Sequence, residues 1–305
     1  FCHHNADPDA IGSAFAFKGL LTHLRPKLKT EIVAASGPSR LSKAMMEYLN
    51  LELTDKPQID AADLFVLLDT NNLQQLDTWS ERITPDRSLL VIDHHALHPE
   101  TERIARFSIA DESASSACEV VYRLFKEAQV VPSLDEAKAL FLGIAFDTRH
   151  FTIATSETLQ VVADLTSVGI NPLETLPVLS LPMEYSERVA RLKASTRMKL
   201  LAVDRWLVAL SYVSAYHASA CRGLIALGAH VAIVAGKKDN EIRVSFRAAR
   251  EFYLETGIHM GRDMAKPLGD FLNGMGGGHS LSAGANGTGD IESCLIFCEK
   301  LLKKE

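Results

Sequence analysis

The sequence lacks the features that define membrane, secreted and disulfide-rich proteins. It has no run of about 18 apolar residues, so we expect no transmembrane helix, and it shows no secretory signal pattern. Its five cysteines are odd in number and have no paired spacing, which argues against a disulfide framework and indicates a reducing compartment. We therefore expect a cytoplasmic protein that contacts no membrane.

An excess of positive charge is also missing. The 305 residues carry a net charge of −6, which gives no sign of a general nucleic-acid-binding surface. Any nucleic-acid substrate should therefore be short, or be held by a local basic pocket. Because the strand-like stretch "FCHHN" starts at residue 1, we also expect the whole protein to have residues before Phe1.

What the chain does contain is a regular alternation of strands and helices. Short apolar runs such as "LFVLLD" (64–69) and "LLVID" (89–93) alternate with amphipathic stretches at 114–129 and 134–147. This pattern predicts an α/β fold built on a doubly wound, mainly parallel sheet. In such sheets the functional groups gather at the carboxyl ends of the strands.

The composition changes after the proline-rich stretch 170–188. Strand-like segments follow at 205–213, 230–249 and 279–289, the second with a hairpin turn near "KKDN", and a terminal helix is predicted over 290–305. We expect a two-domain protein with a catalytic domain over 1–183, a helical connector over 184–198 and a smaller α/β domain over 199–305.

Acids and histidines recur in four stretches of the first domain. Each stretch has an ordinary interpretation, because a D-x-D is usually a turn or a helix cap and a strand often ends in a polar residue. Their order and their placement at the ends of buried segments make a shared site the better interpretation. In chain order the four stretches supply His3, Asp7 and Asp9; Asp69; Asp93, His94 and His95; and Asp147.

This mixture of carboxylates and imidazoles indicates the metal. Carboxylates alone would suggest Mg²⁺ and histidines alone Zn²⁺, whereas the mixture favours Mn²⁺, Co²⁺ or Fe²⁺ in a two-metal site. Two such ions can bind a phosphoryl group on both sides and generate hydroxide at neutral pH. We expect two divalent ions, with Mn²⁺ first, and Mg²⁺ as a further possibility.

The motifs "HHNADPD", "LLDT", "DHH" and "AFDT", in this order, resemble those of the DHH phosphoesterase superfamily. A segment "GMGGGHSLSAGA" (274–285) is similar to the GGGH segment of that superfamily's nucleic-acid-associated C-terminal domain. One departure is Ala6, where many members carry proline. The resemblance runs from residue 3 to about residue 285 and implies an active site in a cleft between two domains.

The resemblance also implies a role for each residue. Asp69 would bridge two metals, Asp93 would orient the DHH motif, and His95 would face the substrate phosphate. A metal-bridging hydroxide would be the nucleophile, and His4 is given no role. The implied ligands are His3 and Asp7 for one metal and Asp9, His94 and Asp147 for the other.

In the second domain, glycines that let backbone N–H groups approach phosphate lie near arginines of "RVSFRAAR". Arg243 and Arg247 share a face if this stretch is a strand, and Arg247 takes the position of a phosphate-binding arginine in related enzymes. Arg250 could be a solvated charge at a helix end. The expected substrate-binding residues are His95, Arg247, Gly276, Gly277, Gly278 and His279.

The resulting hypothesis is a Mn²⁺-dependent phosphodiesterase that cuts short oligoribonucleotides, similar to the nanoRNases that also dephosphorylate 3′-phosphoadenosine 5′-phosphate. The alternatives are a cyclic- or linear-dinucleotide phosphodiesterase, a RecJ-like single-strand DNA exonuclease, a family II inorganic pyrophosphatase and a metal-free nucleotide-binding protein. The sequence does not decide between RNA, DNA and a signalling dinucleotide, and it leaves a homodimer open.

Overall fold

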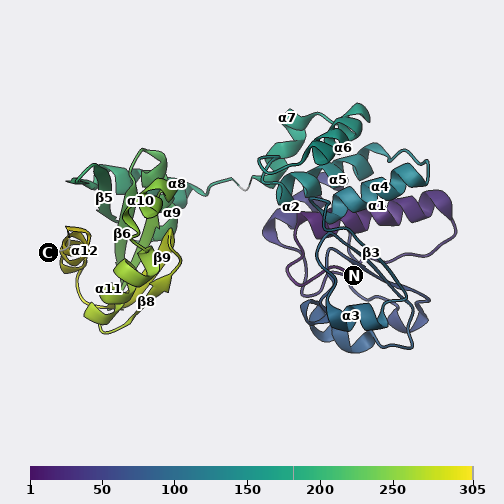
Figure 1. The fold of residues 1–305 in the computed structure, drawn as a ribbon, viewed down its shortest axis with the longest axis horizontal. Helices are drawn as coiled ribbons and strands as arrows, with labels where there is room; N and C mark the ends of the chain where they lie inside the picture. Colours follow the sequence, from purple (N-terminus) through teal and green to yellow (C-terminus); the bar gives the residue numbers. More distant parts are fainter. Residues whose placement is uncertain (181, 304–305) are drawn as a thin grey trace. The chain divides into compact units, whose positions relative to one another are not determined.

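The computed structural model describes residues 1–180 and 182–303. The chain divides into two compact units, Phe1–Leu181 and Pro182–Glu305 (Figure 1). Each unit has its own sheet and its own hydrophobic core. No helix in the described part of the chain is long and apolar enough to cross a membrane.

The first unit is built on a parallel sheet of three strands in the order β1-β2-β3. Its strands are β1 (Phe65–Leu68), β2 (Leu89–Asp93) and β3 (Phe107–Ala110). The two strands predicted from the apolar runs are thus confirmed to within one residue, whereas β3 was not predicted. The stretch at residue 1 forms only an isolated bridge between Cys2 and Ala34 rather than a full strand.

Helices surround this sheet. Because strand side chains alternate, Leu68 and Ile92 point into a core shared with the main helices, while Leu67 and Val91 join a second cluster on the other face. The predicted doubly wound α/β arrangement is confirmed. The helices are α1 (Pro8–Leu24), α2 (Arg40–Leu49), α3 (Pro99–Ile104), α4 (Ala117–Glu127), α5 (Leu134–Asp147), α6 (Ser156–Ser167) and α7 (Pro172–Thr175), with 3₁₀ segments η1 (Ile59–Ala61), η2 (Leu73–Arg82) and η3 (Leu176–Leu179).

The second unit contains a mixed sheet of six strands in the order β4-β5-β6-β7-β9-β8. Only the β5–β6 pair is parallel among the described strands of this sheet. The strands are β4 (Lys199–Val203), β5 (Trp206–Tyr212), β6 (Val231–Lys238), β7 (Glu241–Ala248), β8 (Met275–Gly278) and β9 (Ser282–Thr288).

The helices of the second unit cover both faces of the sheet. They are α8 (Tyr185–Thr196), α9 (His217–Ala226), α10 (Arg250–Thr256), the π-helix η4 (Met260–Ala265), α11 (Lys266–Phe271) and α12 (Ile291–Lys303). The helix expected as a connector, α8, packs against α9 and so belongs to this unit. The predicted terminal helix is present as α12, and residues 304–305 lie outside the described residues.

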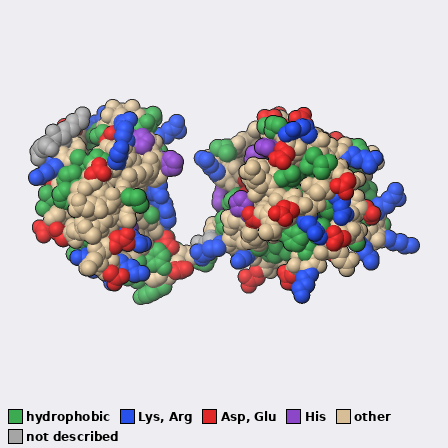
Figure 2. Space-filling model, turned by 90° about the horizontal axis from the view of Figure 1, so that it is seen from below, with side chains coloured by type: hydrophobic (Ala, Val, Ile, Leu, Met, Phe, Trp, Pro, Cys, Tyr) green, Lys and Arg blue, Asp and Glu red, His purple; other side chains and the backbone are tan. Residues whose placement is uncertain are grey.

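Strand β7 has two different faces. Ile242, Val244 and Phe246 are buried in the core, so the alternating residues Arg243, Ser245 and Arg247 lie on the opposite face of the sheet. The prediction that the two arginines share a face is therefore confirmed. On the side of the molecule that Figure 2 shows, acidic and basic side chains are interspersed over each unit, in keeping with the small net charge.

Candidate metal centre

Six of the predicted residues come together in the first unit. Their imidazole nitrogens and carboxylate oxygens, with those of two neighbours, form three groups in which all ligand atoms lie within 4.8 Å of one another. The groups are His3, Asp7 and Asp69; Asp9, His94 and Asp147; and Asp69, Asp93, His94 and His95.

Asp7 is held by the start of helix α1. It is the N-cap of this helix, and its Oδ1 accepts hydrogen bonds from the backbone N–H groups of Asp9 and Ala10 at 3.0 and 3.1 Å. Pro8 follows as the first helical residue, where its missing N–H costs nothing. This leaves Asp7 Oδ2 directed toward the site, 3.8 Å from His3 Nε2.

Asp9 is fixed by the start of helix α4. Its side chain is fully buried, and its carboxylate accepts hydrogen bonds from the backbone N–H groups of Ala117 (2.6 Å) and Cys118 (2.9 Å). A helix N-terminus favours negative charge, so this contact holds a buried carboxylate in place. Asp9 Oδ2 lies 4.0 Å from His94 Nε2.

Asp69 lies between the two ligand groups. It directly follows β1 in a left-handed conformation (φ 56°), which aims its carboxylate into the site. Its Oδ2 is 3.7 Å from His3 Nε2, and its Oδ1 is 3.4 Å from His94 Nε2. Each oxygen of Asp69 therefore faces a different group.

Asp147 reaches the site from the last residue of helix α5, with Oδ2 at 3.2 Å from His94 Nε2. The C-terminus of a helix disfavours negative charge. A carboxylate in this position therefore calls for a neighbouring cation. The acid predicted after a buried segment is the last residue of this helix, and the amphipathic stretch predicted over 134–147 is helix α5.

Asp93 is fully buried and its oxygens are occupied by hydrogen bonds. Oδ1 accepts from the backbone N–H groups of His94 (2.7 Å) and His95 (3.1 Å) and lies 2.9 Å from His95 Nδ1. Oδ2 accepts from Asn71 Nδ2 at 2.7 Å. Asp93 thus orients the two histidines, and the His95 ring, whose side chain is 63% exposed, borders the pocket.

Two buried polar atoms at the centre of the site make no hydrogen bond in the described structure. They are Asp69 Oδ1 and His94 Nε2. Buried polar atoms are nearly always paired, so these two atoms require a partner, and both are good metal ligands. The donor set therefore fits divalent cations.

The electrostatics of the site agree with this conclusion. Burial and the nearby carboxylates of Asp69 and Asp147 raise the pKa of Asp9 well above its usual value. Burial lowers the pKa of His94, but the carboxylates of Asp147 and Asp69 outweigh it and raise that pKa to about 11. Burial also lowers the pKa of His3, but the carboxylates of Asp69 and Asp7 outweigh it and raise that pKa to about 10. The site holds an excess of negative charge that a cation would neutralise.

The centre opens into a pocket of about 430 Å³. Its lining includes four polar residues that sequence reasoning missed: Thr70, Asn71, Asn72 and Gln75. Thr70 Oγ1 donates to Gln75 Oε1 at 2.7 Å, and the Gln75 carbonyl accepts from the backbone N–H of His4. The polar run "TNN" directly after Asp69 was the available signal.

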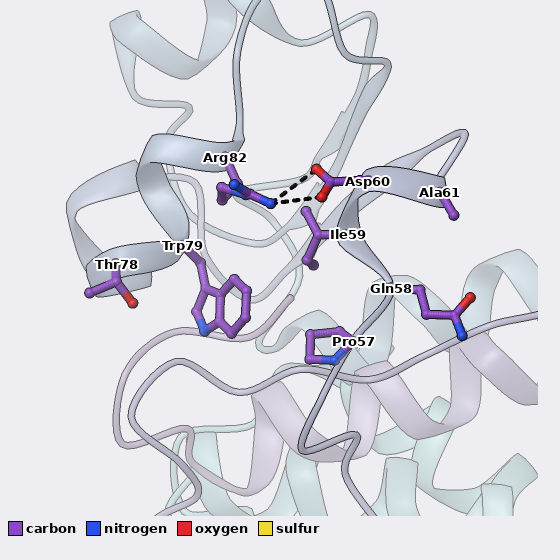
Figure 3. Close-up of a pocket in the computed structure, with 8 residues that line it drawn as sticks. All are labelled: Pro57, Gln58, Ile59, Asp60, Ala61, Thr78, Trp79 and Arg82. Carbon is purple, nitrogen blue, oxygen red and sulfur yellow. Dashed lines mark hydrogen bonds and ion pairs between the residues drawn. The ribbon is translucent and has the colours of Figure 1, made fainter.

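Figure 3 shows another hollow of the first unit, with a larger volume of about 590 Å³. Its ionisable lining residues, Asp60 and Arg82, bind each other through two hydrogen bonds of 3.0 and 3.1 Å. Because this pair is neutral and no histidine lines the hollow, it has no donor set for a metal. The smaller pocket is the better candidate for the chemistry.

The remaining predicted residues belong to the second unit. In the segment "GGGH", Gly276, Gly277 and Gly278 belong to the edge strand β8, which is followed by an exposed His279. The glycines differ in what surrounds them. A Cβ on Gly276 would lie 1.7 Å from the carbonyl oxygen of Ala265, whereas a Cβ on Gly277 would meet nothing within 4 Å. Gly276 is therefore required by packing, and Gly277 leaves an open surface.

The strand register extends this open surface. Arg247 pairs with Ser282, and Gly284 pairs with Gly277, which places these four residues on one face of the sheet. The face combines a half-buried arginine with backbone that carries no large side chains. It has the chemistry to receive a phosphate or a nucleoside.

The chain belongs to the DHH family. The N-terminal domain of this family matches residues 1–144. An uncharacterized protein of Methanocaldococcus jannaschii is 34% identical over 100% of this chain and 93% of its own length. The C-terminal domain predicted from "GGGH" lies beyond the matched residues and stays a prediction.

Other similar proteins align over about half of their length. A probable bifunctional oligoribonuclease and PAP phosphatase NrnA of Streptococcus mutans is 30% identical over 53% of this chain and 50% of its own. A probable manganese-dependent inorganic pyrophosphatase of Lactococcus lactis is 32% identical over 48% of this chain and 47% of its own.

The fold of the whole chain is similar to that of a solved structure. An exopolyphosphatase-related protein from Bacteroides fragilis aligns with a TM-score of 0.59 and 21% identity, covering 99% of this chain and 90% of that one. The family and the Asp/His site together define a metal-dependent phosphoesterase of the DHH family.

Proposed function

We propose that this phosphoesterase hydrolyses short nucleic-acid phosphodiesters as an oligoribonucleotide exonuclease and also acts on 3′-phosphoadenosine 5′-phosphate. The observation that carries the proposal is the position of Asp69. One of its oxygens faces His3 at 3.7 Å and the other faces His94 at 3.4 Å. A carboxylate shared in this way suits two cations bound side by side, the arrangement used for phosphoester hydrolysis.

The proposed ligands divide into two sets that share Asp69. His3 and Asp7 would hold one divalent cation, and Asp9, His94 and Asp147 would hold the other. Mn²⁺ suits this mixture of imidazole and carboxylate, and similarity to a protein named as a manganese-dependent pyrophosphatase supports the choice. When bound, the two cations would supply positive charge to the phosphate and a hydroxide nucleophile at neutral pH.

The protein's own groups would orient the reaction. Asp93 holds the backbone of His94 and the ring of His95, so the imidazole of His95 is fixed at the edge of the pocket. From there His95 could donate a hydrogen bond or a proton to a phosphate oxygen, because its other ring nitrogen is held by Asp93. Asp93 would act through the two histidines and not on the phosphate itself.

The second unit would bind the rest of the substrate. Arg247 offers a planar fork that can pair two phosphate oxygens at once. The open surface at Gly277 would let sugar or base approach the strand, with Gly278 and His279 continuing the same segment, and Gly276 would support it by packing on Ala265.

Hydrolysis of a substrate panel in Mn²⁺ tests the proposal. The panel contains 5′-phosphorylated RNAs of two to five nucleotides, a long single-stranded DNA, a cyclic dinucleotide, 3′-phosphoadenosine 5′-phosphate and pyrophosphate. Preference for the short RNAs over pyrophosphate is the expected result. Preference for pyrophosphate or for long DNA would keep the metal centre and overturn the substrate assignment, and a panel with no turnover would overturn the enzymatic role.

A further inference from the structure

We infer that Asn71 is a positioning residue that sets the geometry of the metal centre by locking the Asp93-His94-His95 loop to the loop that carries Asp69. The inference rests on the proposed metal site and assigns a role to a residue outside both proposed ligand sets. It concerns how tightly this chain holds its cations.

Every polar atom of the Asn71 side chain has a partner in the segment that runs from Asp93, at the end of β2, to His98. Nδ2 donates to Asp93 Oδ2 at 2.7 Å and to the carbonyl oxygen of Ala96 at 3.2 Å. Oδ1 accepts from the backbone N–H of His98 at 2.9 Å. The Asn71 carbonyl also accepts a hydrogen bond from Thr101 Oγ1, in the first turn of α3.

The burial of these groups makes the contacts strong and hard to replace. Asn71 is only 7% exposed and Asp93 is fully buried, so water cannot take over the lost hydrogen bonds. An unpaired oxygen of a buried carboxylate carries a large desolvation penalty. Asp93 without Asn71 would therefore turn, and its other oxygen would release the backbone N–H groups of His94 and His95.

The chain position of Asn71 makes this a link between two ligand loops. It lies two residues after Asp69, the residue placed between the two ligand groups, and it grips the segment that begins with Asp93 and His94. Asn71 binds Asp93, and Asp93 binds the backbone of His94. These buried hydrogen bonds connect the loop of Asp69 to that of His94 and so help to fix the 3.4 Å distance between Asp69 Oδ1 and His94 Nε2. Groups that orient metal ligands in this way usually contribute strongly to metal affinity.

Only an amide satisfies all of these partners. A carboxylate at residue 71 would keep the acceptor for His98 but would set a second negative charge against Asp93 Oδ2. Alanine would remove both donors and the acceptor. Asn71→Asp and Asn71→Ala should therefore both weaken metal binding, with the aspartate the more harmful of the two.

The test is direct Mn²⁺ binding by calorimetry and electron paramagnetic resonance, on wild type and variants, with no substrate present. We expect Asn71→Ala to bind Mn²⁺ about 10–100-fold more weakly than wild type. Adding Asn71→Ala to Asp93→Ala should cost little more, because Asn71 acts through Asp93. The matched control is Thr175→Val, which removes a buried hydroxyl that donates to the Asn171 carbonyl, away from the metal centre.

The outcomes separate this inference from the proposed function. If wild type binds two Mn²⁺ and Asn71→Ala binds them equally well, the inference is wrong and the proposed function stands. If Asn71→Ala and Thr175→Val lose affinity to the same extent, the effect of Asn71 is general destabilisation and the inference is also wrong. If wild type binds no Mn²⁺, the proposed function itself fails.

Discussion

Gly143 on α5 lies directly against the carboxylate of Asp9 on α1. A Cβ at residue 143 would come within 2.9 Å of Asp9 Oδ1 and 2.3 Å of Cys118 Sγ. The absence of a side chain on α5 is therefore what allows the buried carboxylate to reach the start of α4.

Gly143→Ala should destabilise the protein and weaken Mn²⁺ binding together. The added methyl group has to displace either Cys118 or Asp9, at a cost of about 1–3 kcal/mol. Urea unfolding and a Mn²⁺ titration measure the two effects. Gly223→Ala in α9 is the matched control, since its nearest neighbours at 3.3 Å and beyond are atoms of the Arg191 side chain, which can move. Equal behaviour of the two variants would contradict the packing argument.

Asp69→Ala should abolish hydrolysis, because both proposed cations lose a shared ligand. Asp69→Asn is the sharper variant, since asparagine tolerates the left-handed backbone at φ 56° and keeps the shape of the side chain. We expect both variants to remain folded by circular dichroism and to bind fewer than two Mn²⁺ ions by metal analysis. Turnover retained by Asp69→Asn would remove the bridging assignment.

Arg247→Ala should weaken the binding of short nucleotides by about 2–5 kcal/mol and leave the metal content unchanged. The Michaelis constant for a dinucleotide and the bound Mn²⁺ report the two quantities. Arg243→Ala is the control on the same strand face, because its guanidinium already binds Glu241 at 2.7 Å. An unchanged Michaelis constant in Arg247→Ala would argue against its role.

Gly276→Ala should lower stability, whereas Gly277→Ala should weaken substrate binding. The first places a Cβ 1.7 Å from the Ala265 carbonyl oxygen and should lower the unfolding free energy of the second unit, whereas the second has open space around it. Gly277→Ala should therefore keep its stability and raise the Michaelis constant for short RNA. Thermal unfolding and steady-state kinetics separate the two effects, and a stable Gly277→Ala with wild-type kinetics would exclude this surface from substrate binding.

The cluster of acids and histidines was predictable because its residues sit in order at the ends of apolar segments. Asp69 and Asp93 could be placed from the rule that parallel strands end at one edge of the sheet. The division of the ligands came from family resemblance, and the structure brings the same residues into the corresponding groups.

Other features could not be read from the chain. Strand β8 is almost entirely glycine, which has low strand propensity; it forms by pairing with β9, and its Gly276 allows close packing on Ala265 of η4. Strand β3 is exposed along all four residues and lacks the continuous apolar run that marks β1 and β2. Asn71 was missed because its role depends on partners 22 to 30 residues away, which no local pattern reveals.

Strand β7 ties the stability of the second unit to its chemistry. Ile242, Val244 and Phe246 fill the core, while Arg243 and Arg247 occupy the alternate positions. A one-residue slip of β7 against its neighbouring strands would exchange these two sets, burying the arginines and exposing the apolar side chains. One inserted or deleted residue within β7 should therefore be far more harmful than one in the exposed turn before it, which can change length without shifting the strand.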